Sequence, residues 1–205
     1  DVVNMRRDCI VRVPRNINPF VAAFTELVSV SVHAIDRFDK IAHERRKTVG
    51  IWGDGNLGYI TAIFFKAMFP EVKLCIFGLD ENKLSDFTFA DDTFSITSIP
   101  DDLSIDHAFE CVGGEGSPKA INQIIDYINP EGTISILGVS ENPVAINTRM
   151  ILEKGLRMFG SSRSGRKDFE KTIALYQSNP EIVEYLQNII GATVNVHTCL
   201  LYTSP

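Results

Sequence analysis

The sequence lacks several features that define whole classes of protein. It contains no stretch of about 18 consecutive apolar residues, so no membrane-spanning helix is expected. The first seven residues include no apolar core of a secretory signal. The sequence also does not begin with Met, which suggests that the start of the protein is missing. Lys and Arg number 20 against 26 Asp and Glu, so neither a nucleic-acid partner nor a membrane partner is favoured.

Cysteine is sparse and unpaired in the sequence. Its four positions, Cys9, Cys75, Cys111 and Cys199, include no closely spaced pair of the kind that binds a metal. Cys75 and Cys111 lie inside apolar runs, where cysteine behaves as a small hydrophobic residue. We therefore expect four reduced thiols in a cytoplasmic protein.

The sequence does have the composition of a globular protein, with 205 residues, 44% hydrophobic and 22% charged. Short β-branched runs alternate with segments of helical periodicity, which predicts βαβ units and a mostly parallel sheet. From Thr48 onward the strands are continuously apolar, as strands covered on both faces must be. The predicted fold is α/β, a Rossmann-type doubly wound sheet. Predicted strands are 9–13, 48–52, 72–77, 93–96, 105–112, 133–139, 156–160 and 193–196. Predicted helices are 19–37, 56–69, 80–87, 117–128, 167–177 and 181–190, with a turn at 129–132.

A glycine-rich segment follows the strand 48–52 and opens the next helix. Gly53, Gly55 and Gly58 match G-x-G-x-x-G in the strand-to-helix context that a dinucleotide site requires. The first glycine permits a tight turn, the second lets the backbone approach a pyrophosphate, and the third allows close packing of helix on strand. A glycine-rich turn without a ligand is the alternative. The predicted cofactor-binding loop comprises Gly53, Asp54, Gly55, Asn56, Leu57 and Gly58.

The end of the next strand bears on the choice between NADPH and NADH. A site that prefers NAD places a carboxylate there, about 20 residues after the glycines, to accept from the ribose 2′-OH. Here the strand ends in Gly78, and Lys83 follows nearby to pair with a 2′-phosphate. This arrangement favours NADPH, whereas NAD is favoured if Asp80 occupies the tip.

Two further strand ends carry glycine. Val112 and Gly113 follow one strand, and Gly138 and Val139 follow another. Ligands of doubly wound sheets bind at the carboxyl ends of the strands, so we expect these residues to border a nicotinamide ring. The alternative is that glycine simply ends each strand.

The order of these segments resembles that of the medium-chain dehydrogenase/reductase superfamily, the zinc alcohol and polyol dehydrogenases. The likeness rests on a strand before Pro14, the segment 22–34, the glycine loop, Glu110-Cys111-Val112-Gly113 and Ile136-Leu137-Gly138. It extends to about Val196. Within the superfamily, the segments 25–38, 50–58 and 160–164 look most like the ribulose-5-phosphate reductases, also called ribitol-5-phosphate dehydrogenases.

This resemblance implies an NADP-dependent oxidoreductase that reduces D-ribulose 5-phosphate to D-ribitol 5-phosphate with help from zinc. The product would supply CDP-ribitol for teichoic acid and capsule, with a cytidylyltransferase as a candidate partner. The likeness also implies a homo-oligomer joined along the sheet edge near 139–163. The alternatives are another polyol or alcohol dehydrogenase that uses NAD, and a non-catalytic dinucleotide-binding module.

The resemblance also places the zinc ligands, a Cys and a His-Glu pair, before Asp1, so that the N-terminal part of the family's catalytic domain is absent. Glu26 matches an acidic residue that approaches the zinc, although a role at the helix start is equally open. One ligand cannot hold a catalytic zinc, which takes three protein ligands. We therefore expect this chain alone to bind no catalytic zinc and to transfer no hydride.

The same resemblance divides the chain into four parts. Residues 1–35 would be a remnant of a GroES-like catalytic domain with its connecting helix, and 36–162 would be the Rossmann domain. Residues 163–198 would return to the catalytic domain, and 199–205 would be an unrelated tail.

A basic turn follows the strand 156–160. Arg163 and Lys167, with Arg166 between them, are candidates to bind the substrate phosphate because cations bind phosphate oxygens well. A solvated basic turn is the alternative. For His33, a buried position on the core face of its helix is favoured over contact with a cofactor.

Overall fold

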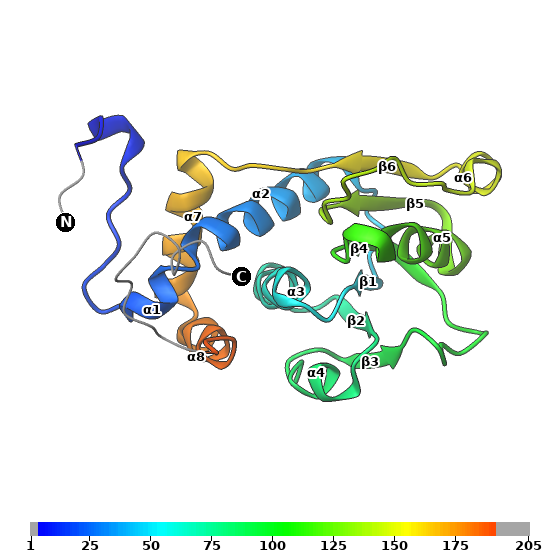
Figure 1. The fold of residues 1–205 in the computed structure, drawn as a ribbon, viewed down its shortest axis with the longest axis horizontal. Coiled ribbons are helices and arrows are strands. Elements are labelled where there is room, and N and C mark those ends of the chain that lie inside the picture. The colour runs from blue at the N-terminus through cyan, green and yellow to red at the C-terminus, as the bar shows by residue number, and fades with distance from the viewer. Residues whose placement is uncertain (1–3, 192–205) are drawn as a thin grey trace.

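The computed structural model describes residues 4–191 and builds them around one six-stranded parallel sheet (Figure 1). The strand order is β3-β2-β1-β4-β5-β6, so the order reverses direction between β1 and β4. This is the strand order of the Rossmann fold, and the predicted α/β class is confirmed. The strands are β1 Thr48–Trp52, β2 Lys73–Gly78, β3 Asp92–Ser95, β4 Ile105–Glu110, β5 Ile128–Ile136 and β6 Arg157–Gly160.

Helices cover both faces of this sheet. In Figure 1, α3 and α5 lie on opposite sides of it, and α2 runs from the N-terminal part of the chain to the sheet. The α-helices are α1 Pro19–Ala22, α2 Thr25–Ile41, α3 Asn56–Met68, α4 Glu81–Ser85, α5 Ser117–Tyr127, α6 Thr148–Lys154, α7 Arg166–Ser178 and α8 Pro180–Asn188. The short 3-10 turns are η1 Arg7–Cys9 and η2 Gly114–Gly116. Among the described residues, no helix is both long and apolar enough to cross a membrane.

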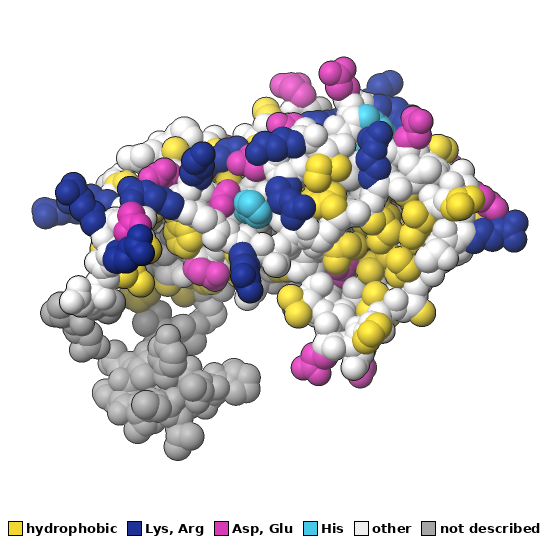
Figure 2. Space-filling model, turned by 90° about the horizontal axis from the view of Figure 1, so that it is seen from above, with side chains coloured by type: hydrophobic (Ala, Val, Ile, Leu, Met, Phe, Trp, Pro, Cys, Tyr) yellow, Lys and Arg dark blue, Asp and Glu magenta, His cyan; other side chains and the backbone are white. Residues whose placement is uncertain are grey.

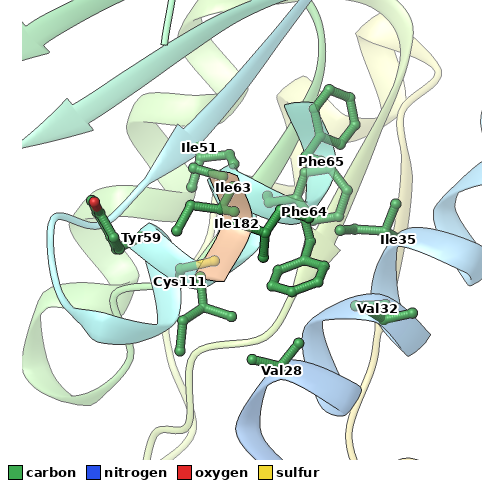
Figure 3. Packing of buried hydrophobic residues seen from close by; sticks show 14 of the residues in the cluster. Val28, Val32, Ile35, Ile51, Tyr59, Ile63, Phe64, Phe65, Cys111 and Ile182 are labelled. Atoms are coloured by element: carbon green, nitrogen blue, oxygen red, sulfur yellow. The ribbon is translucent and has the colours of Figure 1, made fainter. Parts of the chain in front are cut away.

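Two apolar cores lie on the two faces of the sheet because successive strand residues point in opposite directions. Ile51 packs into the cluster under α2, α3, α7 and α8, whereas its neighbour Trp52 packs into the cluster under α5. Figure 3 shows the first cluster, in which Phe64 and Phe65 of α3 approach Ile35 of α2. Both faces of β1 are therefore buried, as its apolar sequence predicts.

The amino ends of the central strands are held by a buried carboxylate. Asp106, at the start of β4, accepts hydrogen bonds from the backbone N–H groups of Lys47 and Thr48, from Arg45 and from Asn129. Burial alone would raise the pKa of Asp106, but these hydrogen bonds outweigh it and leave the pKa below its ordinary value. This carboxylate lies at the opposite end of β4 from the glycine-rich turn.

Several sequence-based expectations differ from the structure. The predicted strand 9–13 is absent, because η1 and irregular chain occupy that region and no described strand lies beside it to form a ladder. The predicted helix 19–37 is split near Ala23 into α1 and α2, and α2 continues to Ile41. The predicted turn 129–132 lies within the bounds of β5 as an irregularity, with Glu131 at φ 64°.

The predicted strand 193–196 and tail 199–205 lie outside the described residues. The proposed domain boundary at residue 36 falls inside α2, which is continuous there. The division into a Rossmann domain and remnants of a second domain stays a prediction.

Candidate cofactor site

The glycine-rich turn joins β1 to α3 in a conformation that depends on two glycines. Gly53 has φ 128°, a region that side chains disfavour, and a Cβ there would lie 2.9 Å from the carbonyl oxygen of Cys111. A Cβ on Gly58 would overlap the carbonyl oxygen of Gly53. The tight turn and the close helix–strand packing predicted for these positions are therefore present.

The N-terminus of α3 faces outward beside this turn. Gly55 is the N-cap residue, so no side chain accepts from the first N–H groups of the helix. A Cβ on Gly55 would meet no protein atom within 4 Å. The exposed N–H groups near Asn56 and Leu57 and the helix dipole make this end a suitable place for an anionic group.

A cavity of about 260 Å³ opens next to the turn, at the carboxyl ends of β1, β2 and β4. Five residues predicted for the cofactor line it together, namely Gly53, Asp54, Gly55, Gly78 and Val112. Trp52, Lys119 and Gln123 also line it, although the sequence did not point to them. Gln123 accepts from the indole N–H of Trp52 at 2.9 Å, which fixes one wall.

The tip of β2 carries a carboxylate that comes from the glycine-rich turn. Asp54 Oδ2 accepts from the N–H groups of Leu79 at 2.7 Å and Asp80 at 2.8 Å. β2 ends at Gly78, whose missing Cβ leaves room for the Asp54 side chain. Asp80 is the N-cap of α4, and its carboxylate accepts from Asn82 and Lys83 of that helix.

Lys83 does not line the cavity beside the glycine-rich turn. It is exposed on α4 and borders a neighbouring hollow of about 200 Å³ that it shares with Asp54, Gly55 and Asn56. Lys83 therefore lies on the same side as the N-terminus of α3. A role in binding a 2′-phosphate stays a prediction.

The ends of β4 and β5 are joined by the side chain of Glu110, the last residue of β4. Glu110 is fully buried, and Oε1 accepts from the N–H groups of Val112 at 3.0 Å and Gly113 at 2.9 Å. Oε2 accepts from the N–H of Gly138 at 3.2 Å. The predicted nicotinamide residues Val112, Gly113, Gly138 and Val139 thus lie together, and the two valines are exposed.

Cys111 lies between the glycine-rich turn and the loop after β4, and its thiol is unreactive. Its thiol is buried and lies 3.8 Å from Thr61 Oγ1. Burial raises the pKa of Cys111 to about 12, so the thiol stays protonated at neutral pH. Cys9 and Cys75 are also free thiols, whereas Cys199 lies outside the described residues.

A third hollow, of about 630 Å³, lies away from the glycine turn. Glu26, exposed in the first turn of α2, lines it together with Ser164, Gly165 and Arg166. Ser164 lies 2.7 Å, hydroxyl to hydroxyl, from Ser29 of α2, so the loop after β6 is tied to that helix. The position of Glu26 is compatible with a role at a neighbouring site, which stays a prediction.

The expectation that His33 is a core histidine is wrong. Its side chain is about one-third exposed, and Nδ1 lies 3.2 Å from Asp168 Oδ2. Asp168 also accepts from the N–H of Gly165 at the start of α7. His33 therefore links α2 to the N-terminal turn of α7.

The basic turn after β6 contains three cationic side chains that differ in their hydrogen bonds. Arg166 is engaged with Glu170 and with backbone oxygens of Arg7 and Asp8. In residues 4–191, no hydrogen bond is found for the side chains of Arg163 or Lys167. Arg163 also has φ 65°, an uncommon value for a residue with a side chain. Binding of a substrate phosphate by these residues stays a prediction.

The described residues do not fit a catalytic zinc. Within 4–191, no group of three or more His, Cys, Asp or Glu side chains is arranged to hold a metal ion. Glu26 can supply at most one ligand, and a catalytic zinc takes three from the protein.

Two of the residues missed in the sequence carried a signal. Glu110 is a carboxylate at the end of a strand predicted to be buried, a position where carboxylates are uncommon. Lys119 lies in the first turn of α5, at the carboxyl edge of the sheet where ligands bind. Gln123 had no such signal, because its role depends on a contact between α5 and Trp52 of β1, which is distant in sequence.

Comparison with known proteins shows which family this chain is similar to. Residues 82–178 match the family described as Zinc-binding dehydrogenase. The chain is 54% identical over 198 residues to ribulose-5-phosphate reductase 2 of Staphylococcus aureus, covering 97% of this chain and 58% of that protein. It is 50% identical over the same shares to ribulose-5-phosphate reductase of Bacillus spizizenii.

A solved structure has a similar fold. The crystal structure of S. aureus TarJ in complex with NADPH superposes with a TM-score of 0.88 at 55% identity, over 91% of this chain and 59% of that chain. The chain therefore spans less than two thirds of the length of the relatives that it matches.

Proposed function

Since the chain belongs to the zinc-binding dehydrogenases of the medium-chain dehydrogenase/reductase superfamily, we propose that it is the dinucleotide-binding part of an NADPH-dependent ribulose-5-phosphate reductase. The reaction would convert D-ribulose 5-phosphate into D-ribitol 5-phosphate. The observation that carries the proposal is the glycine-rich turn with its open cavity in a chain this similar to two such reductases.

The described residues can bind and orient the cofactor. The N–H groups at the start of α3 would bind the pyrophosphate beside Gly55, where no side chain intervenes. The cavity walled by Trp52 and Gln123 would hold the adenosine end. When bound, NADPH supplies the hydride that reduces the ketone carbon.

Lys83 would pair with the 2′-phosphate that distinguishes NADPH from NADH. It stands beside Asn56 at the positive end of α3, where a further phosphate is favoured. The absence of a side chain on Gly78 leaves the tip of β2 without a carboxylate of its own.

The substrate would lie beyond the nicotinamide end. Arg163 and Lys167 are the proposed contacts to its phosphate, since Arg166 is already paired with Glu170. Glu26 would border the metal site of the complete enzyme from the third hollow. Zinc has no ligand set among the described residues, so this part of the chain contributes cofactor binding.

One observation favours a second candidate, an NAD-dependent polyol dehydrogenase. The Asp54 carboxylate stands at the tip of β2, where NAD-preferring sites place the acceptor for the ribose 2′-OH. The negative charge there would also repel a 2′-phosphate. Measured cofactor preference separates the two candidates.

The cellular setting is part of the same proposal. Free thiols at Cys9, Cys75 and Cys111 support a cytoplasmic location. The product would supply CDP-ribitol for teichoic acid or capsule, with a cytidylyltransferase as partner. A homo-oligomer would form along the edge strand β6. Figure 2, seen from the side of β6, shows hydrophobic side chains gathered on the half of this face that includes β6. Leu152 of α6 is exposed.

The test is a fluorescence titration of the purified chain with NADPH and with NADH. Trp52 is the single tryptophan and lines the cavity, so energy transfer from Trp52 to the bound nicotinamide reports binding. Tight binding of NADPH with weak binding of NADH is expected. A preference for NADH would support the second candidate, and binding of neither by folded protein would contradict a dinucleotide site.

A further inference from the structure

The buried carboxylate of Glu110 has an unusual set of partners. In the part of the chain that the structure describes, no Lys, Arg or His forms an ion pair with it. Its charge is balanced by the backbone N–H groups of Val112, Gly113 and Gly138 alone. A buried carboxylate is costly unless it is fully hydrogen-bonded, so these three bonds fix the position of the backbone around it.

One of these three bonds, from the N–H of Gly138 to Oε2, joins two loops that are distant in sequence. One loop follows β4 and the other follows β5, and Gly114 N donates to Val139 O at 2.7 Å between them. The N–H groups of Leu137 and Gly138 also donate to the backbone carbonyl oxygen of Glu110, at 2.9 Å and 3.1 Å. The approach is so close that a Cβ on Gly138 would overlap the N–H of Gly113 and lie 2.7 Å from both Glu110 oxygens. A Cβ on Gly113 would lie 2.8 Å from Val139 O.

We propose that Glu110 is a positioning residue for the nicotinamide half of the cofactor. Its carboxylate clamps the ends of β4 and β5 together, and the clamped backbone at Gly113 and Gly138 forms the wall against which the ring lies. The exposed side chains of Val112 and Val139 flank that wall. This role rests on the NADPH binding proposed above. Its test therefore measures binding of the whole cofactor and of its adenosine half separately.

The experiment compares two ligands in the Glu110→Gln variant. NADPH reaches the clamped loops, whereas adenosine 2′,5′-bisphosphate carries the adenosine half alone. Glutamine keeps the size of the side chain but turns an N–H donor toward one of the backbone N–H groups. The Kd of NADPH is expected to rise about tenfold while the Kd of the bisphosphate stays unchanged, since one unmet hydrogen bond weakens binding by about that factor.

Asp106→Asn is the matched control. Asp106 is also a buried carboxylate of β4 that binds backbone N–H groups, but it lies at the amino end of the strand. This variant should bind both ligands as the wild type does. If Glu110→Gln does not fold, Gly138→Ala tests the clamp from the other side and should show the same selective loss of NADPH.

Equal loss of both ligands in Glu110→Gln, or of neither, would overturn the proposal. Failure of both Glu110→Gln and Gly138→Ala to fold would also overturn it, because Glu110 would then serve general stability. If the folded wild type binds neither NADPH nor the bisphosphate, the proposed function fails and this role fails with it. If the wild type binds both ligands and the variants bind each of them with the wild-type Kd, only the role of Glu110 fails.

Discussion

Asp54 Oδ2 accepts a hydrogen bond from the backbone N–H of Leu79 at 2.7 Å, which ties the glycine-rich turn to the end of β2. The same oxygen accepts from Asp80, so the two loops beside the cavity are fixed to each other by one carboxylate. Such a connection keeps both loops ordered without a ligand and reduces the entropy lost on binding.

Lys83→Ala should weaken NADPH binding and spare NADH. The ammonium group is proposed to bind the 2′-phosphate, which NADH lacks, so only one cofactor loses a charge-assisted hydrogen bond. We expect the Kd of NADPH to rise about tenfold, measured by fluorescence titration.

Lys73→Ala is the control for that experiment, because Lys73 pairs with Asp92 at the amino end of β2. It removes an equal charge far from the cavity and should leave both Kd values unchanged. Equal losses of NADPH and NADH in Lys83→Ala would mean that Lys83 does not select the cofactor.

Gly58→Ala should destabilise the fold itself. The added Cβ overlaps the carbonyl oxygen of Gly53, a backbone atom that cannot rotate away. The free energy of unfolding should fall by about 1–3 kcal/mol, measured by urea denaturation.

Gly55→Ala provides the contrast. Its Cβ meets no protein atom within 4 Å, so the unfolding free energy should change little. The Cβ would stand where the pyrophosphate approaches, and cofactor affinity should fall. Unchanged affinity would contradict the proposed position of the pyrophosphate.

Acid should destabilise the protein through His107. Burial, and then the neighbouring His43 ring, lowers the pKa of His107 from 6.5 to about 4. Nδ1 accepts from the N–H of Thr133, which also requires the neutral ring at that atom. Between these two pH values the unfolded chain protonates His107 and the folded chain does not. The free energy of unfolding is therefore highest above pH 6.5 and falls as the pH drops toward about 4.

The measurement is the free energy of unfolding by urea between about pH 7 and about pH 5, in the wild type and in His107→Gln. The loss per pH unit from this group is at most about 1.4 kcal/mol, and it should disappear in the variant. His33→Gln, which removes a histidine outside the core, is the matched control. The same pH slope in His107→Gln and the wild type would show that His107 is not responsible.

Arg163 and Lys167 should make the enzyme prefer a phosphorylated substrate to the unphosphorylated sugar. In an active preparation of the enzyme, Arg163→Gln and Lys167→Gln should each raise the KM for ribulose 5-phosphate about tenfold with little change in kcat. The unphosphorylated ketopentose is the control, and its kinetics should not change. Equal effects on both substrates would remove these residues from the phosphate site.

The sequence predicted the parts of the site that depend on local geometry. Gly53 and Gly58 could be assigned because a tight strand-to-helix turn needs glycine at fixed spacing, whatever lies elsewhere. The end of β2 at Gly78 followed from an apolar run that stops there. These features need no knowledge of distant contacts.

Features that depend on distant partners could not be predicted. The bonds from Glu110 to Gly138 and from Asp54 to Leu79 cross between strands, and nothing in the spacing reveals them. His33 is expected on the core face of its helix, whereas its side chain is about one-third exposed and pairs with Asp168 of α7. The strand expected at 9–13 had suitable residues but no neighbouring strand to pair with.

The central position of β1 has a consequence for how this chain folds as it is synthesised. β1 pairs with β2 on one side, but its other edge pairs with β4, which follows only after α4 and β3. Until β4 is made, the nascent sheet presents an apolar unpaired edge. Early folding is therefore slowed by a long-range pairing, and the interval before β4 joins is when aggregation of the unfinished chain is most favoured.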